Sequence, residues 1–335
     1  MADMKRRDFI TLVGGAAAAA WPLAARAQQV KRMPRIGILL FAQADLAVID
    51  PFVRGLEALG YVDGKTVSLE YRDAAGSYAR VAELADELVR LDPDVIFSFG
   101  GDIAPVLKKT AATVKRPRLL DIPMVVVVSN DPVEAGLVAS LGRPGGNITG
   151  LTYVHDALAG KSVELLKDTV PSVSRVAILW NPNHADPEFR ETQRASRALG
   201  VQLQSLEVRE PGDFEGAFQA LGRERPEALI VIGSRLIALQ RHRIGDACAK
   251  NGLILVGVPS WLMEVGALLT YGPNVADIQR RAATYVDKIL KGARPSDLPM
   301  QQPTAFELII NVDVAKKLGV TVPPTVIARA DKVIE

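Results

Sequence analysis

The residues best suited to chemistry stand just after the buried strands that the sequence predicts. They combine glycines, which let a ligand approach backbone N–H groups, with hydroxyl, amide, charged and aromatic side chains. The candidate ligand-binding residues are Phe41, Gln43, Gly100, Gly101, Asp102, Ser129, Asn130 and Asp131 in the first half of the chain, and Trp180, Asn181, Ser234, Arg235 and Trp261 in the second half.

Each of these candidates has a binding role and an alternative structural one. Asp102 or Asp131 could pair with an amine, Arg235 could pair with a carboxylate, and the three aromatic candidates could enclose an apolar or aromatic body. Alternatively, Asp131 caps a helix, Trp180 closes a sheet edge, and Arg235 is a solvated residue at a helix start. Both interpretations stay open at this point.

Sequence signatures of catalysis are missing. The chain has no Gly-rich phosphate loop ending in Gly-Lys-Ser/Thr and no Gly-x-Ser-x-Gly motif. Its three histidines, His155, His184 and His242, have no metal-ligand spacing, and Cys248 is the single cysteine. We therefore expect no catalytic residue, no metal site and no cofactor.

The composition is that of a globular protein with about two domains. The chain has 335 residues, of which 48% are hydrophobic and 23% are charged. A formal net charge of +2 and an aromatic content of 5% argue against a nucleic-acid partner, which would need a basic face or stacking platforms.

Residues 1–27 are predicted to form a signal peptide. A positive start at residues 5–7 precedes an apolar run over residues 9–25 and a small-x-small pattern at residues 25–27. The Arg-Arg-Asp-Phe-Ile segment at residues 6–10 matches a twin-arginine export signal, with an ordinary secretory signal as the alternative.

This segment predicts an exported protein. Cleavage is expected near Ala27, and no cysteine near that position could carry a lipid anchor. We therefore expect the mature chain to be free in the periplasm, with no membrane segment.

The rest of the chain reads as two copies of one unit, strand–helix–strand–helix–strand–helix–strand. Arg35 and Gly60 recur as Arg175 and Gly200 at the same offset. The first helix is predicted over residues 52–59. The strands are predicted at residues 35–40, 66–71, 94–99 and 123–128, and again at 175–180, 202–208, 228–232 and 253–258.

Apolar strands that alternate with helices indicate the α/β class, with parallel sheets covered on both faces. We expect two doubly wound, Rossmann-like lobes, the second beginning near Leu151. Ligands of such sheets bind beyond the carboxyl ends of the strands, so two facing lobes would form one cleft that closes by a hinge.

Several long motifs carry a family resemblance. The chain resembles a family of ABC-transporter substrate-binding proteins in five places. These are the run from Ser129 to Gly150, the segments 160–167, 271–273 and 285–299, and the C-terminal run from Ala328. The family comprises the tryptophan/aromatic-uptake-like proteins of the type I periplasmic-binding-protein fold. The resemblance covers the whole mature chain.

The resemblance implies a small-molecule ligand, a monomer, and delivery to an ABC permease with its ATPase. It implies a three-segment hinge near Gly150, near Tyr271 and near Gln302, and Tyr271 joins the candidate ligand-binding residues. The lobes would comprise residues 34–150 with about 275–300, and 151–270 with about 303–335.

Two positions depart from the family pattern and leave the ligand open. The loop at residues 41–45 and Asp102 both touch the expected pocket. An amino acid or an aromatic or small carboxylate is the favoured class of ligand. Alternatives to transport are a sensor that serves a chemoreceptor or sensor kinase, and a periplasmic enzyme.

Overall fold

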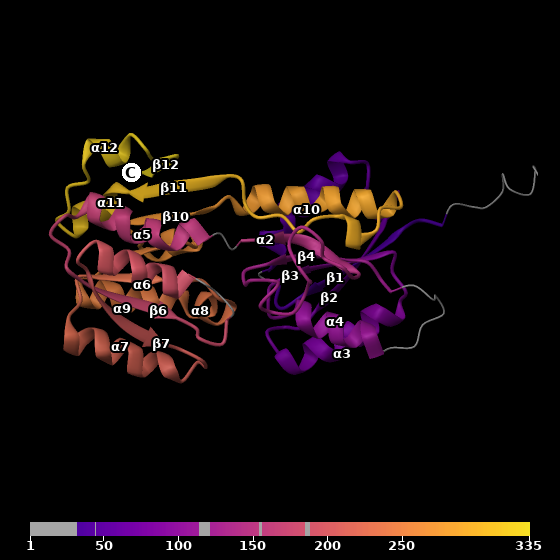
Figure 1. Cartoon of the computed structure of the whole chain (residues 1–335), viewed down its shortest axis with the longest axis horizontal. Helices are drawn as coiled ribbons and strands as arrows, with labels where there is room; N and C mark the ends of the chain where they lie inside the picture. The colour runs from indigo at the N-terminus through magenta and orange to yellow at the C-terminus, as the bar shows by residue number, and fades with distance from the viewer. Residues whose placement is uncertain (1–31, 44, 114–120, 154–155, 185–187) are drawn as a thin grey trace, which may run out of the picture.

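A computed structural model describes residues 32–43, 45–113, 121–153, 156–184 and 188–335. It consists of two α/β lobes that lie side by side (Figure 1). The predicted signal peptide, residues 1–27, lies outside the described residues. Among the described residues no helix is both long and apolar enough to span a bilayer.

The first lobe is built on a five-stranded sheet in which all neighbouring strands are parallel. Its central strands are mostly apolar, which suits a sheet that is covered on both faces. The strand order is β2 (Ser68–Asp73), β1 (Arg35–Leu40), β3 (Val95–Phe99), β4 (Met124–Val128) and β5 (Ile148–Thr152).

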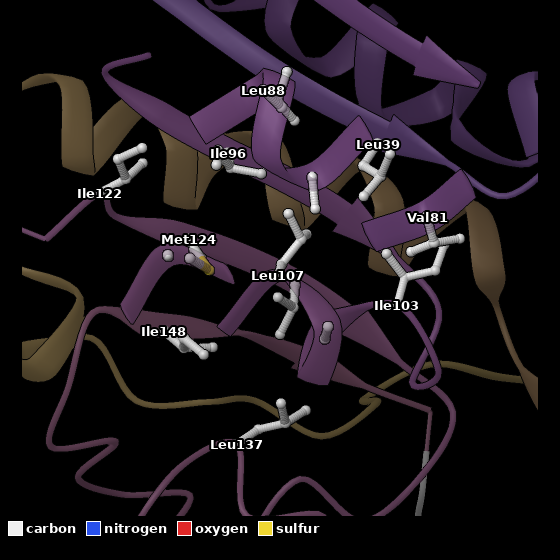
Figure 2. Close-up of a cluster of buried hydrophobic side chains, with 14 of the residues drawn as sticks. Leu39, Val81, Leu88, Ile96, Ile103, Leu107, Ile122, Met124, Leu137 and Ile148 are labelled. Atoms are coloured by element: carbon white, nitrogen blue, oxygen red, sulfur yellow. The ribbon is translucent and has the colours of Figure 1, made fainter. Parts of the chain in front are cut away.

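Two helices cover each face of this sheet. On one face α3 (Tyr78–Arg90) and α4 (Ala104–Thr113) bury Leu88 and Leu107 against Ile96 and Met124, a cluster shown in Figure 2. On the other face α2 (Asp45–Ala58) and α10 (Val275–Leu290) pack on Phe97 and its neighbours. Alternate residues of each strand therefore serve opposite halves of the core.

Helix α2 begins at Asp45 rather than at Phe52, where the sequence predicted it. The Asp45 carboxylate accepts hydrogen bonds from the N–H groups of Phe41 at 2.9 Å and Ala42 at 3.3 Å. These bonds anchor the helix directly behind β1. Pro51 lies inside the helix, where its ring removes one backbone N–H donor.

The second lobe has a seven-stranded sheet with one antiparallel pair, β10 with β11. The chain leaves this lobe after β10 and returns as β11, so these two strands run in opposite directions. The strand order is β12 (Lys332–Ile334), β11 (Phe306–Asn311), β10 (Leu269–Pro273), β9 (Ile254–Gly257), β8 (Ala228–Val231), β6 (Arg175–Trp180) and β7 (Gln202–Glu207).

Helices flank this sheet as they do the first. Helices α5 and α6 lie against one another and cover one face of the sheet, and α7 and α9 cover the opposite face (Figure 1). The helices are α5 (Asp156–Thr169), α6 (Glu188–Ala198), α7 (Asp213–Glu224), α8 (Arg235–Leu239), α9 (Arg241–Asn251), α11 (Val312–Lys317) and α12 (Pro324–Ile327).

The chain passes between the lobes three times. The first passage follows β5, whose last residue is Thr152, so the boundary expected between residues 150 and 151 falls inside a strand of the first lobe. The second lies between β10 and α10, and the third precedes β11. Although α10 comes late in the sequence, it packs beside α2 in the first lobe (Figure 1).

A buried hydroxyl fastens α10 to the segment that leads to the third passage. The Tyr285 ring is 2% exposed, and its OH donates to the Pro299 carbonyl at 2.6 Å. Tyr285→Phe should lower the free energy of unfolding by about 1 kcal/mol, because it leaves that carbonyl without its donor.

Urea unfolding followed by circular dichroism measures this loss. The matched control is Thr284→Ala, since the exposed Thr284 hydroxyl bonds only within its own helix, to the Arg281 carbonyl. Equal stability of Tyr285→Phe and the wild type would contradict the predicted role of the hydroxyl.

Candidate functional site between the lobes

The site lies where the strand order reverses in both sheets. In the first lobe the reversal is between β1 and β3, and in the second it is between β6 and β8. Diverging helices leave a crevice at such a point, beyond the carboxyl ends of the strands. The residues that follow these four strands meet across the cleft, as the hydrogen bonds between the lobes show.

The centre of the cleft is an ion cluster formed by both lobes. Arg235 of the second lobe donates from Nε to Asp102 Oδ2 at 2.7 Å and from Nη1 to both Asp45 carboxylate oxygens at 3.1 Å. Its Nη2 donates to the Phe99 carbonyl at 3.1 Å. Tyr78 OH donates to Asp102 Oδ2 at 2.8 Å, and burial together with the Asp102 charge raises the pKa of Tyr78.

This cluster changes the interpretation of two candidates. From the sequence, Asp102 or Asp131 could pair with an amine of a ligand and Arg235 with a carboxylate of a ligand. In the structure Asp102 and Arg235 are partners of one another. Asp45, which the sequence analysis did not select, is the second carboxylate on Arg235.

A second contact between the lobes joins His184, in the loop after β6, to Ser129, after β4. His184 Nε2 lies 3.0 Å from the Ser129 carbonyl oxygen, so the proton of the neutral ring stands on Nε2. Burial lowers the pKa of His184 from its ordinary value of 6.5, while the Ser129 bond and the Asp102 charge partly offset that effect.

The lowered pKa predicts that acid weakens closure. An open cleft returns the imidazole to water and restores its ordinary pKa near 6.5, so the closed form is favoured while His184 is neutral. Solute affinity should therefore be constant above pH 6.5 and fall as the pH drops from there towards the lowered pKa of the closed form.

Calorimetric titrations between about pH 5 and pH 8, the range in which histidine titrates, measure this dependence. His184→Gln keeps a donor for the Ser129 carbonyl but does not titrate, so its affinity should stay flat over the same range. A variant with an unchanged pH profile would show that another group is responsible.

Aromatic side chains border a narrow cavity on the second-lobe side of the cleft, which in this closed form has no room for a water molecule. The rings of Trp180 and Phe189 stack with centroids 3.9 Å apart and an interplanar angle of 4°. Trp180 Nε1 donates to Ser205 Oγ at 2.8 Å, which fixes the orientation of the indole. The cavity is lined by Trp180, Asn181, His184, Phe189, Ile232, Gly233 and Ser234.

On the first-lobe side, Asn130 is a buried amide with an unused hydrogen-bond acceptor. The residue is 6% exposed, and its Nδ2 donates to the Gly101 carbonyl at 3.3 Å. Its Oδ1 has no hydrogen-bond partner among the described residues. A buried amide oxygen of this kind can accept a hydrogen bond from a ligand.

Other predicted site residues have structural contacts. Phe41 is buried under Tyr78 and the Arg235 guanidinium. Asp131 accepts from the N–H groups of Val133 and Glu134 and so fixes a turn, whereas the helix that the capping alternative placed after it is not formed. The exposed side chain of Gln43 lies in the turn before α2.

The two remaining aromatic candidates lie apart from this cavity. Trp261 belongs to a 3₁₀ helix, η1 (Ser260–Val265), and packs on the cluster beneath α7 and α9. Tyr271 lies on β10, where its ring stacks on Phe306 with centroids 6.1 Å apart. The structure thus brings Trp180 to the cavity but does not place Trp261 opposite it.

The described residues show no grouped metal ligands: among them, no three His, Cys, Asp or Glu side chains are close enough to hold an ion. Cys248 is buried, and burial raises the pKa of its thiol to about 12, so it stays protonated at neutral pH. The side chains that meet in the cleft offer a ligand charge, hydrogen bonds and ring contacts.

A family model for ABC transporter substrate-binding proteins matches residues 36–334. The chain belongs to this family. Its members bind solutes and are not enzymes, which agrees with the absence of catalytic motifs in the sequence. Of the residues that meet in the cleft, Asp45, His184 and Phe189 were not among the predicted candidates; the signal for Asp45 was its place in the loop that follows the first strand.

Individual relatives support the same assignment. The chain is 24% identical to a tyrosine-binding protein of Clostridioides difficile over 270 residues, 80% of this chain and 75% of that protein. A conserved domain protein from Vibrio cholerae is 27% identical with a TM-score of 0.81, and covers 90% of this chain and 100% of its own.

A third comparison is with a ligand complex. The ABC domain from Streptococcus pneumoniae in complex with L-Trp is 24% identical with a TM-score of 0.80, over 90% of this chain and 99% of that one. These likenesses confirm the predicted two-lobed fold of type I periplasmic binding proteins.

Proposed function

We propose that this substrate-binding protein captures an amino acid with an apolar or aromatic side chain between its lobes and delivers it to an ABC permease. The observation that carries the proposal is the convergence of four strand-end loops, with their charged, amide and aromatic side chains, on one cleft.

The two sides of the cleft suit the two ends of such a solute. The Trp180–Phe189 pair offers an apolar surface to a side chain. The unpartnered Asn130 Oδ1 can accept from an ammonium group. Two carboxylates, Asp45 and Asp102, face one guanidinium, so the cluster keeps an uncompensated negative charge that attracts a cation.

Tyrosine and L-Trp, the ligands named for two of these relatives, fit this description. They support an aromatic amino acid as the first class to test, in place of a plain carboxylate. A solute without an ammonium group would leave the Asn130 oxygen without a partner and gain nothing from the excess negative charge.

Transport follows from closure around the solute. We propose that the first lobe (residues 34–152 with α10) and the second lobe move as two bodies about the three connecting segments. A solute that binds the closed form better shifts the equilibrium towards it, and the permease with its ATPase then takes up the closed form. The mature protein acts in the periplasm as a monomer after removal of its signal peptide.

A thermal-shift screen tests the proposal. Aromatic and aliphatic amino acids are compared with the matching acids that lack the amino group, with amines that lack the carboxyl group, and with sugars and nucleosides. Solute at a hundred times its dissociation constant should stabilise the protein by about 2.7 kcal/mol, a shift of a few degrees. Stabilisation by the acids or the sugars alone would contradict an amino-acid ligand.

A further inference from the structure

The first lobe binds the Arg235 side chain as a receptor binds a ligand. Four hydrogen bonds reach all three guanidinium nitrogens: Asp102 accepts from Nε, both oxygens of Asp45 accept from Nη1, and the Phe99 carbonyl accepts from Nη2. The Phe41 ring lies 4.7 Å from the guanidinium carbon and the Phe99 ring 5.9 Å from it. This set matches the planar fork of a guanidinium group and its preference for carboxylates and aromatic rings.

The first lobe holds these groups in place by its own contacts. The N–H groups of Phe41 and Ala42 fix the Asp45 carboxylate. Tyr78 OH fixes Asp102. A Cβ atom added at Gly100 would lie 2.3 Å from Arg235 Nη2, so the glycine is needed for the close approach of the guanidinium.

The arginine comes from the opposite lobe and is largely removed from water. Its side chain is 13% exposed, beside Asp45 at 10% and Asp102 at 23%. It is the first residue of α8, directly after Ser234, whose Oγ accepts from the Ile237 N–H. Because donor and acceptors belong to different lobes, these contacts exist only while the cleft is closed.

Strength distinguishes this contact from the exposed ion pair between the lobes. Arg190 and Glu134 are 3.5 Å apart with side chains 67% and 51% exposed, and such pairs contribute little. The Arg235 cluster combines charge-assisted hydrogen bonds with low exposure, and removal of one partner from such a cluster leaves buried charge behind.

We propose that the first lobe carries a guanidinium-binding site and that Arg235, by filling it, raises the closed fraction of the solute-free protein. All of the contacts join protein atoms to protein atoms, so they form whichever solute the protein carries. The proposal goes beyond the transport function and does not depend on the identity of the solute.

Closure is tested by small-angle X-ray scattering of the protein freed of solute. The wild type, with its larger closed fraction, should have a smaller radius of gyration than Arg235→Ala. In Arg235→Ala the closed-to-open ratio should fall at least about tenfold, the loss expected from a single charge-assisted hydrogen bond. Arg235→Lys keeps the positive charge but not the planar guanidinium group, so its radius of gyration should lie between those of the wild type and Arg235→Ala.

The matched control is Arg190→Gln, which removes the exposed pair and should leave the scattering unchanged. Circular dichroism checks that each variant is folded. A solute-free wild type as expanded as Arg235→Ala, or an equal expansion in Arg190→Gln, would overturn the proposed role of Arg235 in closure.

The binding site itself is tested with methylguanidine as the probe. Calorimetric titration should show saturable binding to Arg235→Ala, whose site is empty of its own arginine, and none to the wild type. Adding Asp102→Asn to the Arg235→Ala protein should abolish that binding. Undiminished binding without Asp102, or none to Arg235→Ala, would overturn the site. Neither experiment uses the transported solute, so failure here is separate from failure of the proposed function.

Discussion

Trp180→Ala should weaken the binding of L-tryptophan or L-tyrosine by about 30-fold, equivalent to about 2 kcal/mol, a typical cost for removing a buried aromatic anchor. The indole borders the cavity, stacks on Phe189 and is held in place by its bond to Ser205. Its removal takes away an apolar wall and leaves Phe189 without its stacking partner. Isothermal titration calorimetry measures the change in the dissociation constant.

Trp261→Ala is the matched control, since it removes an identical side chain from the same lobe. Trp261 packs on the cluster beneath α7 and α9, apart from the cavity. This variant should lose thermal stability but keep its affinity. If both variants lose affinity equally, the cavity by Trp180 is not where the side chain of the solute lies.

Gly150→Ala should lower the free energy of unfolding by about 4 kcal/mol, the sum expected from backbone strain and overpacking. Gly150 stands in the middle of β5 with a φ of +145°, a conformation that residues with a Cβ rarely adopt. An added Cβ would lie 1.9 Å from the Val126 carbonyl oxygen in the neighbouring strand. β4 is held between β3 and β5, and a shift of the edge strand β5 would break its pairing with β4.

Chemical denaturation of purified protein, with soluble yield as a second readout, measures this effect. Gly146→Ala is the control in the loop just before β5, where an added Cβ meets no atom within 4 Å. A Gly150→Ala protein as stable as Gly146→Ala would show that β5 can shift to accept the methyl group. The result matters for function because β5 leads directly into the first connection between the lobes.

The internal repeat and the positions of the strand ends could be predicted from the sequence because they depend on local patterns. The predicted strands at residues 35–40 and 175–180 match β1 and β6, and the loops after them do reach the cleft. Short apolar runs with β-branched residues become buried strands wherever helices can cover them, so their order along the chain carries the architecture.

Two details of the fold, the start of α2 and the direction of β11, were harder to predict from the sequence. The start of α2 at Asp45 depends on hydrogen bonds from the end of β1, and the antiparallel pairing of β10 with β11 depends on the excursion of α10 into the first lobe. The first contact is local, since Asp45 accepts from residues three and four positions before it, whereas no local pattern near residue 306 records the second contact.

The sequence by itself determined the lobes, the strand-end loops and the family motifs, since these follow from residue type and spacing along one segment. Only the tertiary structure decided which charged groups meet: Arg235 lies 133 residues from Asp102 and 190 from Asp45, and the pairs form across two lobes. Coulomb attraction and hydrogen bonding act over a few ångströms in space, whatever the separation in sequence. The partners of Arg235 were therefore set by how the first lobe folds around its guanidinium.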